Sequence, residues 1–340
     1  MWFRKQKNNP CDYDLAVVGD TLGGYVAVLA ALEQGLRVVW LRSECGTGYS
    51  IETEPARFDS LSPEGARYLA HILAPADIEH LQRGRFGGIN RNGIYSPFNQ
   101  ALGCGFQFSI VALKQLLMQK IVPRAKIIQN ADAIFAFDRN CLRISTHTTP
   151  EHILCHWAIN AEGEFSQFSR QMPTYLSEDL WVVRNFGDRS MHYAGDVFFC
   201  EDDISWRWIA YDDEGLACET RWRKPRTGIS IPHNAINARW YKRACCLEYY
   251  DEQLRPVILI GSTFFRVDPA CGLGATLQVK SALYAVACIA RCLSGSVQAP
   301  GELASYQAMM DATFNEVAQP MADFYQAYGV RAGKYYTVVT

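Results

Sequence analysis

A glycine-bearing turn near the N-terminus combines residue types and a spacing that can bind a phosphate group. Gly19 and Gly24 stand at the first and third positions of a G-x-G-x-x-G pattern, with Gly23 just before the last and Thr21 at the second position. Amides at the start of the following helix, together with the helix dipole, favour negative charge above such a turn. The turn therefore has the chemistry to hold the diphosphate of a dinucleotide, although the side chain of Thr21 crowds the phosphates.

Arg42 ends the second strand of the same unit, where dinucleotide-binding folds usually carry an acid for a ribose hydroxyl. An arginine at this position has three interpretations. It accepts the extra phosphate of an NADP-type ligand, it pairs with a phosphate on the adenosine side, or it marks an adenosine site that has decayed. An ordinary α/β domain, whose glycines serve only close helix–strand packing, is the alternative that the spacing leaves open.

Two later segments carry the same kind of signal. One strand reaches a small-residue turn over 161–163, and another strand, over 257–260, leads into Gly261 and Ser262. The alanine-rich helix that comes next begins after the segment Asp268-Pro269-Ala270-Cys271-Gly272-Leu273-Gly274. This segment predicts a second helix N-terminus that is stripped of bulky side chains and directed at something negative or electron-rich.

The hydrophobic pattern supplies the elements that must position these segments. The apolar runs 15–18 and 38–41 flank a helical stretch that Gly35 ends, which completes a βαβ unit. The three-to-four spacing of apolar residues predicts a helix over 110–121. Further helices are predicted from Pro63 to about Ile72 and over 76–82, a hairpin or loop over 87–105, and strands at about 126–129, 132–137, 141–146, 153–160, 180–186, 193–200, 205–211 and 216–222. The predicted fold is α/β, with a Rossmann-like domain of parallel sheet and helices interleaved with a smaller mixed-sheet domain.

Length, charge and cysteine usage set the outer limits. The chain has 340 residues, which suits about two domains, and its net charge of −2 gives no electrostatic case for nucleic acid or an acidic membrane. Its twelve cysteines show no zinc-site spacing, so we expect no metal, and free thiols in a reducing cytoplasm. The N-terminus lacks an apolar core of signal-peptide length, and the most apolar windows, 15–32 and 282–293, are interrupted or too short to span a bilayer. A cytoplasmic location is expected.

Taken in order, these motifs resemble the FAD-dependent aromatic hydroxylase and tryptophan halogenase superfamily. That family runs from a phosphate-binding βαβ unit, through an A-T-G strand end, to a late G-D … D-P … G-x-G segment. This chain keeps the order, over about residues 12 to 330, with the turn at 19–24, then Ala161-Glu162-Gly163, then Gly261 … Asp268-Pro269 … Gly272-Leu273-Gly274. The segment Trp206-Arg207-Trp208 looks like the aromatic strand that lines the substrate side of the flavin in that family.

The resemblance implies FAD as the cofactor and assigns its contacts. The implied cofactor-binding residues are Gly19, Thr21, Gly23, Gly24, Arg42, Gly163, Gly261, Ser262, Asp268, Gly272, Leu273 and Gly274. No catalytic acid or base is identified, and the flavin-facing candidates are Pro269, Cys271, Trp206 and Trp208. The implied division is an FAD-binding domain (1–75, 105–172 and 247–298), a substrate domain (76–104 and 173–246) and C-terminal helices (299–340).

Plainer interpretations compete for several of these residues. Trp206 and Trp208 lie two apart and share one face of a strand, where aromatic pairs belong to a core more often than to a pocket. The thiol of Cys271 can simply fill a small gap. Asp268 can brace its own turn through its side chain instead of contacting a ligand.

Three departures from the family weaken the expected cofactor contacts. Arg42 replaces the ribose-binding acid, Ser262 replaces the Asp that normally holds the ribityl chain, and Ile110 stands where many members carry an arginine. Each change removes a polar contact, although the hydroxyl of Ser262 can still form a weaker hydrogen bond, so we expect FAD to be held loosely or not at all. The chain also has no lysine between Lys7 and Lys114, where halogenases of the family carry a catalytic lysine, which argues against halogenation.

In its length and compact middle region, the chain is similar to short flavoproteins that assist cysteine tryptophylquinone biogenesis in lysine ε-oxidase and glycine oxidase. That resemblance implies a monooxygenase that hydroxylates a tryptophan side chain in a partner protein, the precursor of a quinoprotein oxidase. Molecular oxygen and an unidentified electron donor would be its other partners, because the chain is too short for a separate nicotinamide-binding domain. Two alternatives stay open: a small-molecule aromatic hydroxylase of the same fold, and a non-catalytic binding protein on a flavoprotein scaffold.

Overall fold

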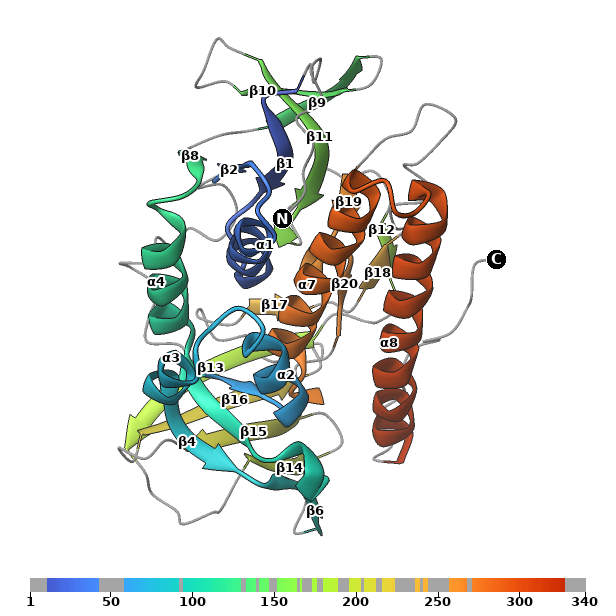
Figure 1. Cartoon of the computed structure of the whole chain (residues 1–340). Helices are drawn as coiled ribbons and strands as arrows, with labels where there is room; N and C mark the ends of the chain where they lie inside the picture. The colour runs from blue at the N-terminus through green and yellow to red at the C-terminus, as the bar shows by residue number, and fades with distance from the viewer. Residues whose placement is uncertain are drawn as a thin grey trace.

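The structure is a computed structural model that describes the larger part of the chain. The described residues are 11–42, 58–91, 94–129, 133–138, 141–146, 152–163, 166, 173–175, 180–188, 196–202, 205–211, 216–223, 236–238, 241–243, 257–267 and 271–327. Figure 1 shows one sheet at each end of the molecule, with helices between them.

The first seven-stranded sheet combines parallel strands with an antiparallel extension. Its strands run in the order β8-β2-β1-β11-β10-β9, and β19 also pairs with β11. β8, β2, β1, β11 and β19 are parallel, whereas β10 and β9 are antiparallel to their neighbours. The bounds are β1 (Tyr13–Val18), β2 (Val38–Leu41), β8 (Lys126–Ile128), β9 (Ala133–Asp138), β10 (Cys141–Thr146), β11 (Ile153–Asn160) and β19 (Val257–Leu259). The α/β fold with a largely parallel sheet is therefore confirmed.

The unit formed by β1, α1 (Leu22–Glu33) and β2 is buried almost completely. Eleven of the twelve residues of α1 are buried, because its sequence carries no charge before Glu33 and can be covered on every side. The helix ends as predicted at Gly35, whose φ of +76° lies in the region that favours glycine. In this unit the glycine turn connects the carboxyl end of β1 to the start of α1.

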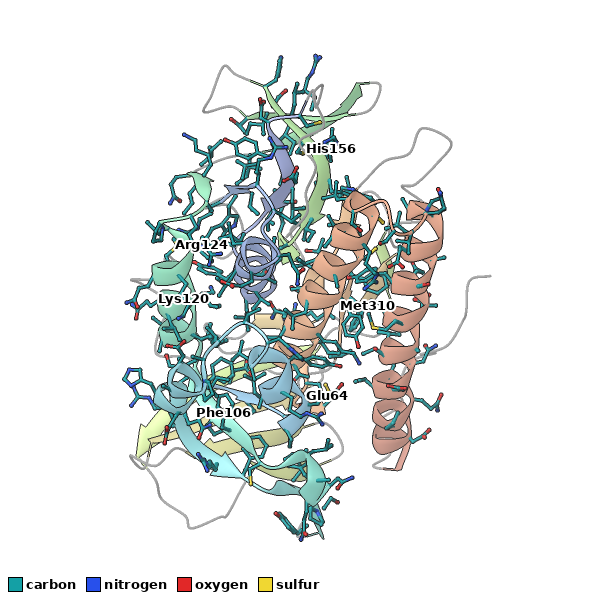
Figure 2. The ribbon with its side chains drawn as sticks, in the orientation of Figure 1. Glu64, Phe106, Lys120, Arg124, His156 and Met310 are labelled. Atoms are coloured by element: carbon teal, nitrogen blue, oxygen red, sulfur yellow. The ribbon has the colours of Figure 1, made fainter. Side chains whose placement is uncertain are left out.

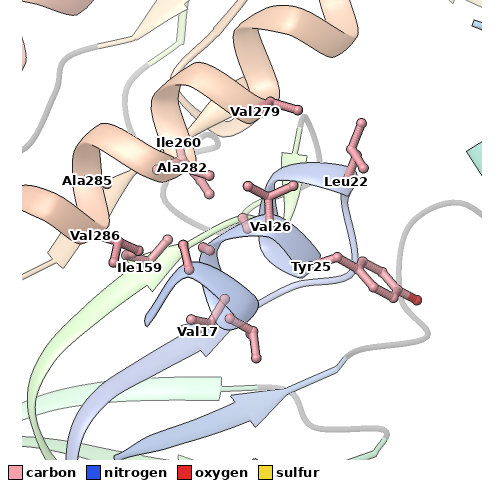
Figure 3. Packing of buried hydrophobic residues seen from close by; sticks show 14 of the residues in the cluster. Val17, Leu22, Tyr25, Val26, Ile159, Ile260, Val279, Ala282, Ala285 and Val286 are labelled. Carbon is pink, nitrogen blue, oxygen red and sulfur yellow. The ribbon is translucent and has the colours of Figure 1, made fainter. Parts of the chain in front are cut away.

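Two long helices, α7 (Gly274–Leu293) and α8 (Ala299–Ala327), complete the main core. Met310 of α8 is fully buried and lies between α7 and α8 (Figure 2). On the other side of α7, Val279 and Val286 pack towards Val26 of α1 (Figure 3). Among the described helices, α7 alone is long and apolar enough to cross a membrane, and half of that apolar window is buried inside the molecule. Its contacts with α1 and α8 are those of a core helix.

The second seven-stranded sheet joins two distant parts of the chain, in the order β17-β13-β16-β15-β14-β5-β6. Its neighbours are antiparallel except for β14 and β5, so the sheet is mixed. The bounds are β5 (Gly88–Arg91), β6 (Ile94–Pro97), β13 (Leu180–Asp188), β14 (Asp196–Asp202), β15 (Ser205–Tyr211), β16 (Leu216–Arg223) and β17 (Ile236–Ala238). The predicted hairpin over 87–105 contains β5 and β6, which pair directly.

Two three-stranded sheets and three short helices connect these layers. The small sheets contain β3 (Phe58–Leu61), β7 (Gly105–Ser109) and β4 (Gln82–Phe86), and β12 (Pro173–Tyr175), β18 (Tyr241–Arg243) and β20 (Phe265–Arg266). The helices are α2 (Pro63–Leu69), α3 (Pro75–Leu81) and α4 (Ile110–Ile121), and α4 has its predicted bounds. α2 starts at its predicted proline, where the Ser62 hydroxyl accepts a hydrogen bond from the Gly65 amide, but it ends before Ile72.

Cys11 departs from the expectation for the cysteines. It is disulfide-bonded, so the prediction that the cysteines are free thiols is wrong for this residue. Its partner is not among the cysteines whose side chains are described, which are free at Cys104, Cys155, Cys271, Cys288 and Cys292. Sequence spacing gave no signal for the bridge, because a disulfide requires two Cα atoms that only the fold brings together.

Candidate functional site

The carboxyl ends of four parallel strands meet at one edge of the first sheet. Val18, the last residue of β1, is in register with Asn160 of β11 and with Leu41 of β2, and Asn160 is in register with Leu259 of β19. The loops that leave these strands therefore lie together. Ligands of open α/β sheets bind outside this edge, so it is the place to look for a site.

Protein atoms surround the glycines of the turn after β1. Gly19 has a φ of +109°, and a Cβ added to it would lie 2.4 to 2.5 Å from backbone atoms of Ala161 and Glu162. A Cβ on Gly24 would lie 2.9 Å from the carbonyl oxygen of Gly19, and one on Gly23 would lie 3.2 Å from the side chain of Ile260. Internal packing thus accounts for the missing side chains, and phosphate binding by these glycines stays a prediction.

Thr21, at the second position of the pattern, is tied to the neighbouring loop. Its hydroxyl donates a hydrogen bond to the carbonyl oxygen of Ala161 at 2.7 Å. Its methyl group would be 3.3 Å from a Cβ on Gly163, whose φ is +79°. The threonine therefore joins the loop after β1 to the loop after β11, a role that the glycine expected here could not perform.

Most amides in the first turn of α1 already have partners. The amide of Gly23 donates to Oε1 of Gln278 at 3.1 Å, and the amides of Gly24 and Tyr25 donate to the carbonyl oxygen of Thr21. Among the described residues, the amide of Leu22 has no hydrogen-bond partner. An anion at this helix start would therefore find one amide of the first turn available, where an uncapped helix leaves several.

Arg42 is held by a carboxylate of its own chain. Its Nε donates to Oδ1 of Asp20 at 2.9 Å, and its Nη2 donates to Oδ2 of Asp20 at 3.0 Å and to the hydroxyl of Tyr25 at 3.0 Å. The guanidinium also lies 5.0 Å from the ring centre of Trp40, and its side chain is only 14% exposed. These contacts engage the arginine within the protein. The two interpretations in which it binds a ligand phosphate gain no support.

The loop after β11 contains a contact that the sequence analysis missed. Asn160 is fully buried, and its Nδ2 donates to Oε2 of Glu162 at 2.8 Å while the amide of Glu162 donates back to Oδ1 of Asn160. The amide of Gly163 donates to the hydroxyl of Thr263 at 2.8 Å, which links this loop to the one after β19. An asparagine at the end of an otherwise apolar predicted strand was the available sequence signal.

The loop after β19 is anchored to α7. Gly261, with a φ of +52°, donates its amide to the hydroxyl of Ser281 at 2.9 Å, and that hydroxyl donates to the carbonyl oxygen of Gln278. A Cβ on Gly163 would lie 3.2 Å from the hydroxyl oxygen of Ser262, so Ser262 stands beside the loop after β11. Gln278, which the sequence analysis did not select, therefore contacts both the first turn of α1 and the loop after β19.

The start of α7 is built differently. Among the described residues, no atom would lie within 4 Å of a Cβ added to Gly272 or to Gly274, so the described part of the chain does not crowd either residue. The Leu273 amide donates to Sγ of the buried Cys271 at 3.4 Å, and the first turn carries no acidic side chain. Within the described part of the chain, the amides of Gly274, Ala275 and Thr276 have no hydrogen-bond partner. This helix start is free to face an electron-rich group.

The two helix starts lie side by side, because the hydrogen bond from Gly23 to Gln278 joins the first turn of α1 to the second turn of α7. Asp268 and Pro269 lie outside the described residues. Trp206 and Trp208 lie in β15, opposite Trp222 and Thr220 of β16, and the placement of their side chains is also outside the description. No group of three or more His, Cys, Asp or Glu side chains in the described part of the chain could hold a metal ion.

Comparison with known proteins shows a shared fold without close sequence relatives. No protein-family model matches the chain, and no curated protein matches it. Among solved structures, PqsL from Pseudomonas aeruginosa, in complex with 2-aminobenzoylacetate, is 14% identical, with a TM-score of 0.73 over 93% of this chain and 96% of PqsL. The p-nitrophenol 4-monooxygenase PnpA from Pseudomonas putida is 18% identical, with a TM-score of 0.74 over 94% of this chain and 90% of PnpA.

A third similar structure is CmlS, a flavin-dependent halogenase, which is 14% identical with a TM-score of 0.74 over 95% of this chain and 66% of CmlS. The halogenase PltM, whose structure contains FAD, reaches a TM-score of 0.68 at 13% identity. The chain therefore has the fold shared by FAD-dependent monooxygenases and flavin-dependent halogenases. At these sequence identities the comparison shows the fold only, and the activity has to be argued from the residues of the site.

Proposed function

We propose that the chain is an FAD-dependent monooxygenase of aromatic substrates. The observation that carries the proposal is the start of α7, where, among the described residues, no atom would lie within 4 Å of a Cβ on Gly274 and the amides of residues 274–276 have no partner. It lies beside the meeting point of three strand-end loops. The similar structures that bind aromatic compounds or FAD support the same assignment.

The residues present fit FAD in outline. The free amide of Leu22 would contact the diphosphate, the hydroxyl of Ser262 a ribityl hydroxyl, and the start of α7 the electron-rich edge of the ring. When bound, FAD supplies the reaction with oxygen that places an oxygen atom on an electron-rich ring. The chain binds and orients the reactants and excludes water. Because Gln278 already takes the Gly23 amide, we expect loose binding.

Flavin titration tests this proposal directly. Purified protein is mixed with FAD, and the flavin spectrum and fluorescence are followed to saturation. We expect saturable binding, followed by transfer of one oxygen atom to an aromatic compound when FAD is reduced in the presence of oxygen, detected by mass spectrometry. Absence of any spectral change in excess FAD removes the enzyme proposal. It would instead favour the alternative of a non-catalytic binding protein on a flavoprotein scaffold.

The finer proposal concerns the substrate. We infer that the aromatic group is a tryptophan side chain in a partner protein, the precursor of a quinoprotein oxidase maturing its cysteine tryptophylquinone, with an unidentified electron donor. The sequence resemblance in length and middle region supports this choice. Competition between a precursor protein and free indoles or phenols tests it. Preferential oxidation of the free compounds would replace it with small-molecule hydroxylation.

We also propose that residues 76–104 and 173–246 form the substrate domain, and that 1–75, 105–172 and 247–298 form the cofactor domain. In support, β5 and β6 share one sheet with β13 to β17, while β1, β2, β8, β11 and β19 share the other. An experimental structure with a bound aromatic compound tests the division. Contacts to that compound should come from both parts of the proposed substrate domain.

A further inference from the structure

Asp20 pairs with the residue that stands where a dinucleotide fold usually carries its ribose-binding acid, although Asp20 itself follows a different strand. In such folds an acid at the end of the second strand accepts a hydrogen bond from the adenosine ribose. Here Arg42 occupies that position and extends back to Asp20, in the turn after β1. We propose that Asp20, oriented by Arg42, is the ribose-binding carboxylate of this chain. The inference rests on the proposed function and names a residue for its cofactor site.

Arg42 is suited to orienting another residue. Two of its nitrogens, Nε and Nη2, form a bidentate pair with Asp20, and Nη2 also donates to the hydroxyl of Tyr25. The guanidinium lies over Trp40, whose Nε1 donates to the carbonyl oxygen of Gly19 at 2.9 Å. The guanidinium is planar, and its contacts with Tyr25 and Trp40 restrain it, so it fixes the carboxylate of Asp20 in position. Asp20 is therefore preorganised before any ligand arrives.

The carboxylate of Asp20 retains acceptor capacity. An ionised carboxylate offers about four lone-pair sites, and Arg42 uses one on each oxygen. Within the described residues, Asp20 receives no other hydrogen bond, and its side chain is 29% exposed. Each oxygen can therefore accept one further hydrogen bond. Two acceptors on adjacent oxygens suit the two neighbouring hydroxyls of a ribose.

The same geometry determines which nucleotides are accepted. A 2′-phosphate in place of the ribose hydroxyl would approach the Asp20 carboxylate, and Arg42 is already engaged in pairing with that carboxylate. The site should therefore prefer an unphosphorylated adenosine ribose. It should also distinguish FAD from FMN, because FMN lacks the adenosine half that Asp20 would contact.

A matched ion pair at the opposite end of β1 provides the control. Asp14 accepts from Nε of Arg37 at 3.2 Å and from Nη2 at 2.8 Å, which is the same bidentate arrangement. Asp14 belongs to β1 near its amino end, whereas Asp20 follows the carboxyl end. Asp14→Asn thus removes a comparable charge and pairing without touching the proposed site.

The experiment measures dissociation constants of FAD and FMN for the wild type, Asp20→Asn and Asp14→Asn, with ADP, AMP and adenosine 2′,5′-bisphosphate as competitors; AMP and the bisphosphate differ only by the 2′-phosphate. We expect Asp20→Asn to weaken FAD and ADP binding by roughly tenfold to a hundredfold, as for a lost hydrogen bond to a charged group, and to leave FMN unchanged. Asp14→Asn should leave all ligands unchanged. Wild type should bind AMP at least tenfold more tightly than the bisphosphate, by about 1.4 kcal/mol.

The outcomes separate this inference from the proposed function. Equal FAD affinity in wild type and Asp20→Asn overturns the role of Asp20 while leaving a flavoprotein. ADP binding that depends on Asp20, without any FAD binding, supports the role and removes the enzyme. Binding of neither ligand overturns both. If Asp20→Asn does not fold, as judged by the melting temperature of the ligand-free protein, the preference of wild type decides, and tighter binding of the bisphosphate would overturn the inference.

Discussion

The two glycine turns at the proposed cofactor site lack side chains for different reasons. In the turn after β1, an added Cβ on Gly19 would lie 2.4 Å from the backbone of Ala161, and one on Gly24 would lie 2.9 Å from the oxygen of Gly19. At the start of α7, an added Cβ on Gly272 or Gly274 would meet no atom of the described residues within 4 Å. The first turn excludes side chains because protein fills the space, whereas the described residues leave the space beside the second open.

This difference shows which glycine reports on a ligand. The φ of +66° at Gly272 accounts for that residue by backbone conformation. Gly274 is not among the glycines with positive φ, and it is the first residue of its helix. Among the described residues, neither packing nor backbone conformation explains Gly274. A bound ligand that needs this space is our proposal, and under it this position carries more information about function than the more familiar pattern at 19–24.

The largest expected effect tests the crowded turn. Gly19→Ala should lower the free energy of unfolding by about 3 to 5 kcal/mol, because a methyl group would overlap the Ala161 backbone at a φ of +109°. Urea denaturation of the ligand-free protein measures it. The control is Gly35→Ala, where φ is +76° but no atom of the described residues would lie within 4 Å of the added Cβ, and where the cost should be about 1 to 2 kcal/mol. Equal losses at the two positions would break the comparison.

The next effect tests the open turn. Gly274→Asp should weaken FAD binding at least tenfold, since a carboxylate would face a ring that becomes partly anionic, while stability should hold because acids suit a helix start. Flavin fluorescence measures the affinity, and Gly274→Ala separates charge from size. Wild-type affinity in the aspartate variant would contradict the placement of the ring. Gly24→Asp cannot serve in its place, because a Cβ there meets the oxygen of Gly19 and would disturb the fold.

Sequence alone specified the parts of this site that depend on local pattern. The strand, turn and helix around 13–33 and the helix from Gly274 follow from hydrophobic runs and glycine positions. The hydrogen bond between Gly23 and Gln278 joins residues 255 positions apart, and no local pattern encodes such a contact.

The pairing of Arg42 with Asp20 was easier to predict from the sequence than the contact between Gly23 and Gln278. Arg42 stands where the family carries an acid, and Asp20 lies in the turn after β1. The βαβ unit places these two positions side by side, so the acid and the base have in effect exchanged places. All three interpretations of Arg42 concern a ligand site, and none of them considers a partner within the chain. Knowledge of the fold was sufficient to predict this pairing, because Asp20 and Arg42 follow the carboxyl ends of the neighbouring parallel strands β1 and β2.

A smaller effect concerns Gln278, which connects the two turns. Gln278→Met should cost about 1 to 3 kcal/mol of stability, because the buried Gly23 amide loses its acceptor. That amide then becomes available to a diphosphate, so FAD affinity should not fall. Gln278→Glu keeps the acceptor and adds a negative charge, so it should preserve stability and weaken FAD. If Gln278→Met lowers stability without weakening FAD binding, and Gln278→Glu weakens FAD binding without lowering stability, the glutamine competes with the ligand. If stability and FAD affinity fall together in both variants, the glutamine only supports the fold.

The smallest effect comes from the far end of the same strands. His156 belongs to β11 and follows Cys155, which is in register with Tyr13 at the amino end of β1, away from both turns (Figure 2). Burial lowers the pKa of His156 below its ordinary 6.5, against the opposing charge of Asp14. The unfolded chain therefore binds the proton more readily than the folded one, so stability is full above pH 6.5 and declines as the pH falls below it.

His156→Gln should remove that decline, as measured by urea denaturation between pH 5 and pH 8. FAD affinity at neutral pH should be the same in the variant and the wild type, because neither turn contacts this residue. An unaltered pH slope would assign the decline to another group. A change in FAD affinity would show that the two ends of the sheet are energetically coupled. The contrast between the crowded and the open turn would then depend on more than the carboxyl edge of the sheet.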